Sequence, residues 1–157
     1  MSRFLYAVLL SSLFFLLSFI GCSPASKVDQ TSFCDFELTP CQATLADGSM
    51  IRFDIEPRPI QPLSLLVLSV YLASGDDVDV TVDLTMPTMQ MGRNHIVLQR
   101  QTMDGEHQPF TALYRSTGSI VKCISGERRW DALITIHPTL QSEAVPATVH
   151  FQFEVSK

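Results

Sequence analysis

Strict alternation of apolar and polar residues constrains the fold of this chain more than any other feature of its sequence. In residues 77–86 every second side chain is apolar, and the side chains between them are acids or threonines. The apolar set consists of Val78, Val80, Val82, Leu84 and Met86. A period of two places such a set on one face of a β-strand and the polar set on the other. We therefore expect a strand here, with one face in a hydrophobic core.

Similar short runs recur along the chain after residue 31, whereas helical periodicity is scarce. The other expected strands are residues 51–55, 63–72, 96–98, 110–114, 119–124, 130–136 and 147–155. Residues 63–72 are almost continuously apolar, which suits a strand buried on both faces. About seven or eight short strands at regular spacing predict an all-β fold, an antiparallel β-sandwich, with a small barrel as the alternative.

The N-terminal segment is expected to lie outside this fold. Arg3 precedes an apolar run, Phe4–Ile20, that ends in small residues, as in a secretory signal peptide covering residues 1–21. Residues 18–22 (SFIGC) resemble a bacterial lipobox, in which Cys22 is diacylated and becomes the new N-terminus. The alternatives are an ordinary cleaved signal with an unmodified Cys22 and an uncleaved membrane anchor.

Residues 22–31 are small and polar, and they indicate a lipidated tether between a membrane and the folded domain, residues 32–157. Several acyl chains on Cys22 would hold the protein firmly in a bilayer, because each buried methylene contributes about 0.8 kcal/mol. Cys22 is followed by Ser23 and not by an aspartate, which resembles the pattern of lipoproteins that are sorted by default to the outer membrane, facing the periplasm. We therefore expect the protein in the bacterial cell envelope.

The charge balance and the motifs that the sequence lacks disfavour several classes of function. The formal net charge is −5, and loss of residues 1–21 removes Arg3 and no acid, which leaves −6. An acidic chain without basic clusters argues against nucleic acid as a partner and against electrostatic adhesion to anionic lipid. The sequence contains no nucleophile elbow, phosphate-binding glycine loop or zinc motif. A role other than that of an enzyme is therefore expected.

Beyond Cys22, three cysteines remain for disulfide formation, namely Cys34, Cys41 and Cys123. Outside the cytoplasm paired cysteines are normally oxidised, and three thiols make one bridge with one left over. Cys34 and Cys41 flank a loop short enough to close locally, whereas a bridge to Cys123 would fasten the N-terminal segment to the sheet. Reversible thiol exchange through Cys34 and Cys41 is a weaker hypothesis, because the chain has no CxxC motif.

Three methionines and a histidine lie within ten residues, in the stretch MPTMQMGRNH that begins at Met86. Thioether sulfur is a soft, neutral ligand that prefers Cu(I) over hard cations. In an extended segment Met89 and Met91 share one side at a spacing of about 7 Å, and a turn near Gly92 would bring the His95 imidazole toward them. The candidate Cu(I) ligands are therefore Met86, Met89, Met91 and His95.

The alternative assigns the same methionines to the hydrophobic core. Met86 continues the inward phase of the preceding strand, and Met89 would cover one end of the fold, because methionine fills irregular gaps. In that interpretation His95 is a strand-end histidine that binds no metal.

The pattern Met86-Pro87-x-Met89-x-Met91-Gly92 follows an alternating strand and precedes a Gly-x4-Trp strand at Gly126–Trp130. In this it resembles the YtkA-like and FixH-like domains, which are small Ig-like domains, membrane-anchored or periplasmic. Such domains often accompany genes for copper handling or respiratory-oxidase assembly. The resemblance covers about residues 54–136, and it implies an Ig-like sandwich, copper ligation by the methionine loop, and Trp130 as a core or corner aromatic.

Together these features predict a lipid-anchored Ig-like β-sandwich that binds Cu(I), hands it to a partner protein in the envelope and performs no bond chemistry. The competing hypothesis is a structural or interaction lipoprotein that contacts another envelope protein, binds no metal and keeps its methionines in the core.

Overall fold

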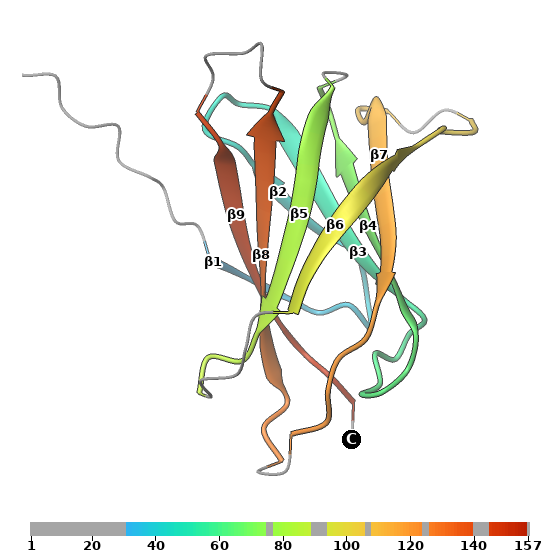
Figure 1. The fold of residues 1–157 in the computed structure, drawn as a ribbon, viewed down its shortest axis with the longest axis vertical. Coiled ribbons are helices and arrows are strands. Elements are labelled where there is room, and N and C mark those ends of the chain that lie inside the picture. Colours follow the sequence, from blue (N-terminus) through green and yellow to red (C-terminus); the bar gives the residue numbers. More distant parts are fainter. Residues whose placement is uncertain are drawn as a thin grey trace, which may run out of the picture.

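The computed structural model describes residues 31–74, 77–88, 94–105, 108–123, 126–139 and 145–156, and every regular element in these ranges is a β-strand (Figure 1). The strands are β1 (Thr31–Cys34), β2 (Cys41–Thr44), β3 (Met50–Glu56), β4 (Leu66–Leu72), β5 (Val78–Thr85), β6 (Asn94–Gln101), β7 (Ala112–Gly118), β8 (Arg129–Pro138) and β9 (Ala147–Glu154). The predicted all-β class is confirmed, with nine strands in these ranges in place of seven or eight. The predicted signal peptide, and the predicted tether up to residue 30, lie outside the described residues.

The nine strands form one continuous mixed sheet in the order β1-β9-β8-β5-β6-β7-β4-β3-β2. β1 runs parallel to β9, so the prediction of a purely antiparallel fold is wrong for this pair. β6 joins the two halves of the sheet, because Asn94–Leu98 pair with β5 and Gln99–Gln101 pair with β7. Figure 1 shows the sheet curled into a nearly closed barrel, and the described strands do not divide into the two separate sheets of a sandwich.

Alternation along the strands places one apolar face inside the barrel. In β5 the predicted inward residues Val80, Val82 and Leu84 are buried. Phe53 of β3 stacks on Phe151 of β9, with 5.9 Å between the ring centroids. These two strands stand near opposite ends of the sheet order. The curled sheet therefore brings its two halves together around one core.

The predicted burial of the fourth strand on both faces is correct only in part. On the outer face of β4, Val67 and Tyr71 are half-buried, whereas Ser69 between them is 3% exposed. The Nε–H of Arg115 in β7 donates to Ser69 Oγ at 3.1 Å. A buried hydroxyl is thus satisfied by a neighbouring strand, in a position where the sequence suggested an apolar layer.

The expected strand at residues 119–124 is absent from the described part of that segment, residues 119–123. β7 ends at Gly118, and Ile120 turns into the core, where it is fully buried. The Ile120 carbonyl accepts the backbone N–H of Leu63 at 2.7 Å. This apolar run therefore forms a connection in which Ile120 is buried, while Val121 and Lys122 are exposed.

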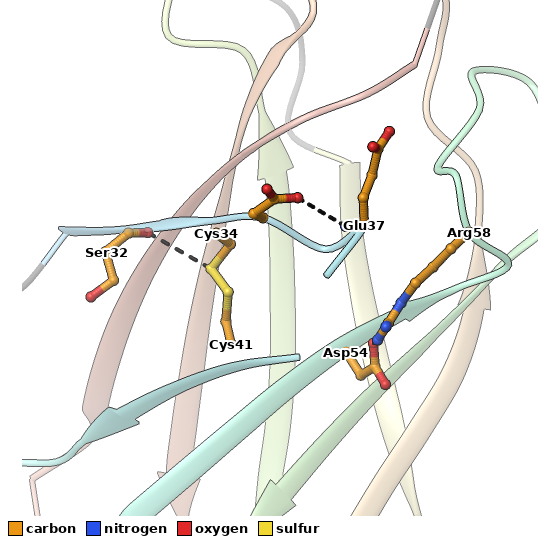
Figure 2. The surroundings of a disulfide bond; sticks show 7 residues. Ser32, Cys34, Glu37, Cys41, Asp54 and Arg58 are labelled. Atoms are coloured by element: carbon orange, nitrogen blue, oxygen red, sulfur yellow. Dashed lines mark hydrogen bonds and ion pairs between the residues drawn. A yellow bond between two sulfur atoms is a disulfide. The ribbon is translucent and has the colours of Figure 1, made fainter. Parts of the chain in front are cut away.

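β1 and β2 are the two edge strands of the sheet, and they are consecutive in the chain. The disulfide Cys34–Cys41 joins them, as Figure 2 shows. Of the two connectivities considered above, the local one is therefore formed, and Cys123 is a half-buried thiol. In the short connection, the backbone N–H of Glu37 donates to Asp35 Oδ1 at 3.1 Å, which shapes the turn.

The connections between strands gather at two ends of the barrel. Those that follow β1, β3, β5 and β7 lie at the end that is lower in Figure 1, together with the C-terminus, and we call it the lower end. Those that follow β2, β4, β6 and β8 lie at the upper end. The described start of the connection between β5 and β6, residues 86–88, therefore lies at the lower end.

Candidate functional site

The candidate site lies where β5 ends and β6 begins. Met86, the first residue after β5, is 3% exposed and belongs to the hydrophobic core, as its phase in the alternation predicts. Met89 and Met91 lie outside the described residues. His95 is the second residue of β6, and it stands directly opposite Asp83 of β5 in the antiparallel register.

His95 and Asp83 form a close polar pair on the outer face of the sheet. The distance from His95 Nδ1 to Asp83 Oδ1 is 2.7 Å. The imidazole side chain is 54% exposed, whereas the Asp83 side chain is 12% exposed. A mostly buried carboxylate thus holds a mostly exposed ring in a fixed orientation.

This pairing determines which ring nitrogen is available for other chemistry. An ionised carboxylate only accepts hydrogen bonds, so Nδ1 carries the hydrogen in the neutral ring and Nε2 keeps its lone pair. Among the described residues, none donates a hydrogen bond to His95 Nε2. A histidine whose other nitrogen donates to a carboxylate has the arrangement common among metal-ligating histidines.

The structure separates Met86 from His95. Met86 is buried inside the barrel, while His95 stands on the outer face with its partner Asp83. The two side chains therefore lie on opposite sides of the sheet and do not bind the same ion. The candidate set divides accordingly: Met86 is a core residue, and His95 is available to ligands outside the barrel.

A second histidine–aspartate pair lies on the same outer face. Cross-strand register places in one row His95, Asp83, Leu133 and His150, on β6, β5, β8 and β9. His150 Nε2 is 3.3 Å from Asp131 Oδ1, and this oxygen also accepts from Gln152 Nε2 at 3.0 Å. The two histidines are three strand spacings apart, about 14 Å, so they belong to separate pairs.

Glu127 lies beside the start of the methionine stretch. Its Oε1 accepts the backbone N–H groups of Arg129 and Arg128 at 3.0 and 3.1 Å, and Thr88 Oγ1 lies 3.5 Å from Oε2. The N–H of Arg129, followed by that of Arg128, holds the pKa of the Glu127 carboxyl below its usual value. The carboxylate therefore accepts hydrogen bonds at the start of β8 and lies close to Thr88, in the connection after β5.

The remaining predicted site residues are cysteines. Cys34 and Cys41 are used in the disulfide, and the predicted lipidation residue Cys22 lies outside the described residues. Within the described ranges, no three His, Cys, Asp or Glu side chains are grouped so that they could hold a metal ion. The same ranges contain no helix of the length and hydropathy needed to cross a membrane.

The residue that sequence reasoning missed is Asp83. The alternation predicts that Asp83 lies on the polar face with the neighbouring acids and threonines, whereas in the structure the whole residue is only 9% exposed and its carboxylate is bonded to His95. Only the register of β5 against β6 brings these two residues together. The sequence does hold one signal for the pair: Asp83 is an outward-facing acid near the end of one strand, and His95 lies near the start of the next.

Comparison with known proteins adds no relative to this description. No protein-family model, no curated protein and no solved structure matches the chain.

Proposed function

We propose that this protein is an envelope lipoprotein that binds Cu(I) without catalysing a reaction, with His95, Met89 and Met91 as ligands. The observation that carries the proposal is the His95–Asp83 pair, which fixes an exposed imidazole at the end of the β5–β6 connection. Met86, which is in the core, is not part of the proposed ligand set.

The chemistry of the donors supports a soft monovalent ion. Neutral thioether sulfur suits Cu(I), and imidazole is a borderline ligand that suits both oxidation states of copper. Asp83 would orient the His95 ring and leave the lone pair of Nε2 for a metal ion, because its carboxylate accepts the hydrogen on Nδ1. Three neutral ligands without a net negative charge favour reversible binding, which a protein that delivers copper to an envelope partner requires.

The proposed location follows from the sequence of the N-terminal segment. An acylated Cys22 would anchor the protein in the outer membrane, and the tether would leave the domain in the periplasm. In this setting the partner would be an envelope protein of copper handling or respiratory-oxidase assembly.

A Cu(I) competition titration against a chromogenic chelator tests the proposal. The mature chain is compared with the double variant Met89→Ser, Met91→Ser and with His95→Ala. His137→Ala is the matched control, because His137 is an exposed histidine near the C-terminal end of β8, away from His95 on β6. Stoichiometric binding that both site variants lose and the control keeps supports the proposal, and equal binding by all four proteins rejects it.

The burial of Met86 favours one alternative, an interaction lipoprotein that binds no metal. In that case the wild-type chain does not compete with the chelator, and Met89→Ser with Met91→Ser changes the free energy of unfolding or the binding of a protein partner instead. The same set of proteins, followed by urea denaturation, separates the two functions.

A further inference from the structure

Leu63 has a backbone conformation and an exposure that neither strand geometry nor core packing explains. Its φ is 65°, in the left-handed region that favours glycine, and it is the one non-glycine residue with positive φ among the described residues. Its side chain is 72% exposed. A leucine here gains nothing from its backbone conformation or from burial within this molecule, which points to a contact outside it.

The connection that carries Leu63 is held rigidly. Ile60 is buried in the core, and its carbonyl accepts the backbone N–H of Ser156 at 2.8 Å. The N–H of Leu63 donates to the Ile120 carbonyl at 2.7 Å. Three prolines, at 57, 59 and 62, restrict the backbone between β3 and β4. Leu63 and the nearby Leu65, which is 70% exposed, are therefore presented to the outside by a preorganised loop.

These leucines belong to a larger apolar surface at the lower end. The bond between Leu63 and Ile120 places Leu63 beside Val121, which is 41% exposed. We call Leu63, Leu65 and Val121 the leucine tip. Leu38, in the connection after β1, is exposed at the same end. Four of the seven large exposed apolar side chains among the described residues thus lie on lower-end connections.

The two ends differ in charge as well as in hydropathy. The four connections at the upper end contain no lysine or arginine, and the described part of them includes Asp47, Asp77 and Asp104. The lower-end connections carry a slight excess of bases over acids. Their bases are Arg58, Arg93, Lys122 and Arg128, and their acids are Asp35, Glu37 and Glu127. Arg58 is paired with Asp54, whereas Lys122 beside Val121 is exposed. An acidic end is expected to stay in water, whereas apolar side chains flanked by bases suit a membrane interface.

We propose that the leucine tip inserts into the surface of the lipid bilayer that carries the protein's own acyl anchor. This inference rests on the proposed acylation of Cys22 and is independent of copper. The ten residues from Cys22 to Thr31 are joined by nine steps, which span at most about 32 Å when extended, so an anchored domain stays within reach of the bilayer. A tether of this length allows either end of the barrel to contact the bilayer. The exposed apolar side chains of the lower end indicate that this end makes the contact.

The test places a tryptophan at each end of the barrel in turn. The mature protein derived from the full chain, as Leu65→Trp or as Val145→Trp, is reconstituted into phosphatidylcholine vesicles with or without brominated acyl chains. Val145 is 82% exposed and lies in the upper-end connection before β9, so it is a matched control. Trp130 is 3% exposed and contributes the same background to both variants.

We expect brominated lipid to quench Leu65→Trp about threefold more strongly than Val145→Trp, and the emission of Leu65→Trp to shift to the blue. Equal quenching of both variants overturns the inference. A concentration-dependent blue shift of Leu65→Trp without vesicles also overturns it, because the tip would then contact a second copy. Intact-mass measurement tests the anchor separately: a chain without acyl groups on Cys22 overturns the anchor and this inference together, whereas an acylated chain with equal quenching overturns the tip alone.

Discussion

Cys34 and Cys41 lie on the two edge strands of the sheet, and their disulfide joins those edges with the Cα atoms 5.7 Å apart (Figure 2). An open sheet edge presents unpaired backbone groups that can template association with another chain. β1 and β2 are not paired by backbone hydrogen bonds in this sheet, and the disulfide and the short connection join them instead. The disulfide thus completes a barrel whose first and last strands in the sheet order are neighbours in the chain.

Removing this disulfide should lower the stability of the whole barrel. The double variant Cys34→Ser, Cys41→Ser loses the cross-link of a short loop, which is worth about 2.5 kcal/mol in the chain-entropy model. Urea denaturation under non-reducing conditions measures the loss. Cys123→Ser is the control, because Cys123 is outside the disulfide. A loss in the double variant no larger than in the control would show that the edges hold together without the bond.

Phe36 should contribute more to the stability of the fold than the disulfide beside it. It is 3% exposed, and it packs edge-to-face on Phe53 of β3 and Phe153 of β9, at 5.6 and 5.4 Å between centroids. Truncation of a buried phenylalanine costs about 3–5 kcal/mol, so Phe36→Ala should destabilise the fold by that amount in urea denaturation. Leu38→Ala, two residues away and 75% exposed, should change stability by less than about 0.5 kcal/mol. Similar effects of the two substitutions would contradict a core role for this connection.

The pattern of the sequence predicts the strands well, and it predicts their arrangement poorly. Alternation identifies β5 with the correct inward residues, because side-chain direction follows directly from the period of two. It does not specify that β1 runs parallel to β9 or that β6 pairs with two different strands. Such pairings depend on contacts between segments far apart in the chain, which leave little trace in local composition.

The same limit applies to the candidate site. The inward phase of Met86 is a local property and was readable from the sequence, and the structure confirms the burial. The contact between His95 and Asp83 depends on register across the β5–β6 connection, so the candidate ligand could be named while the residue that orients it could not. The ligand roles of Met89 and Met91 stay predictions, because both residues lie outside the described ranges.

Glu127 should make stability at the start of β8 depend on pH on the acidic side. Its carboxyl pKa is lowered from 4.5, first by the backbone N–H of Arg129, so the charged form is favoured by folding. A lowered folded pKa stabilises the native state above the unfolded pKa, and this contribution is lost as pH falls through the folded pKa. Glu127→Gln should therefore have a lower melting temperature than wild type near neutral pH, and the difference should vanish once the pH falls below the folded pKa.

A carbon-13 NMR titration of the Glu127 carboxyl checks the cause of this behaviour directly. A midpoint at or above 4.5 would contradict the role assigned to the two N–H groups. Glu37→Gln serves as the control in the melting experiments, because Glu37 is an exposed glutamate on a different lower-end connection. Its melting temperature, followed over the same pH series, gives the effect of removing a glutamate charge elsewhere at the lower end.

Asp83→Asn should weaken copper binding while the fold survives. The substitution keeps the shape of the side chain and a hydrogen-bond acceptor for His95 Nδ1, but it removes the negative charge that holds the hydrogen on Nδ1. Loss of such an orienting carboxylate typically costs about 10–100-fold in metal affinity, so the Cu(I) competition curve should shift by that factor. Urea denaturation of the copper-free protein should establish that the variant is folded.

Asp79→Asn is the matched control, because it makes the same charge change on the outer face of β5 away from His95. Its copper affinity should match that of wild type. Nitrogen-15 NMR of the His95 imidazole supplies a readout that a purely structural role would not move: the hydrogen should reside on Nδ1 in wild type and should redistribute toward Nε2 in Asp83→Asn. Unchanged affinity together with an unchanged tautomer would show that Asp83 stabilises the strand pair and does not prepare His95 for a metal.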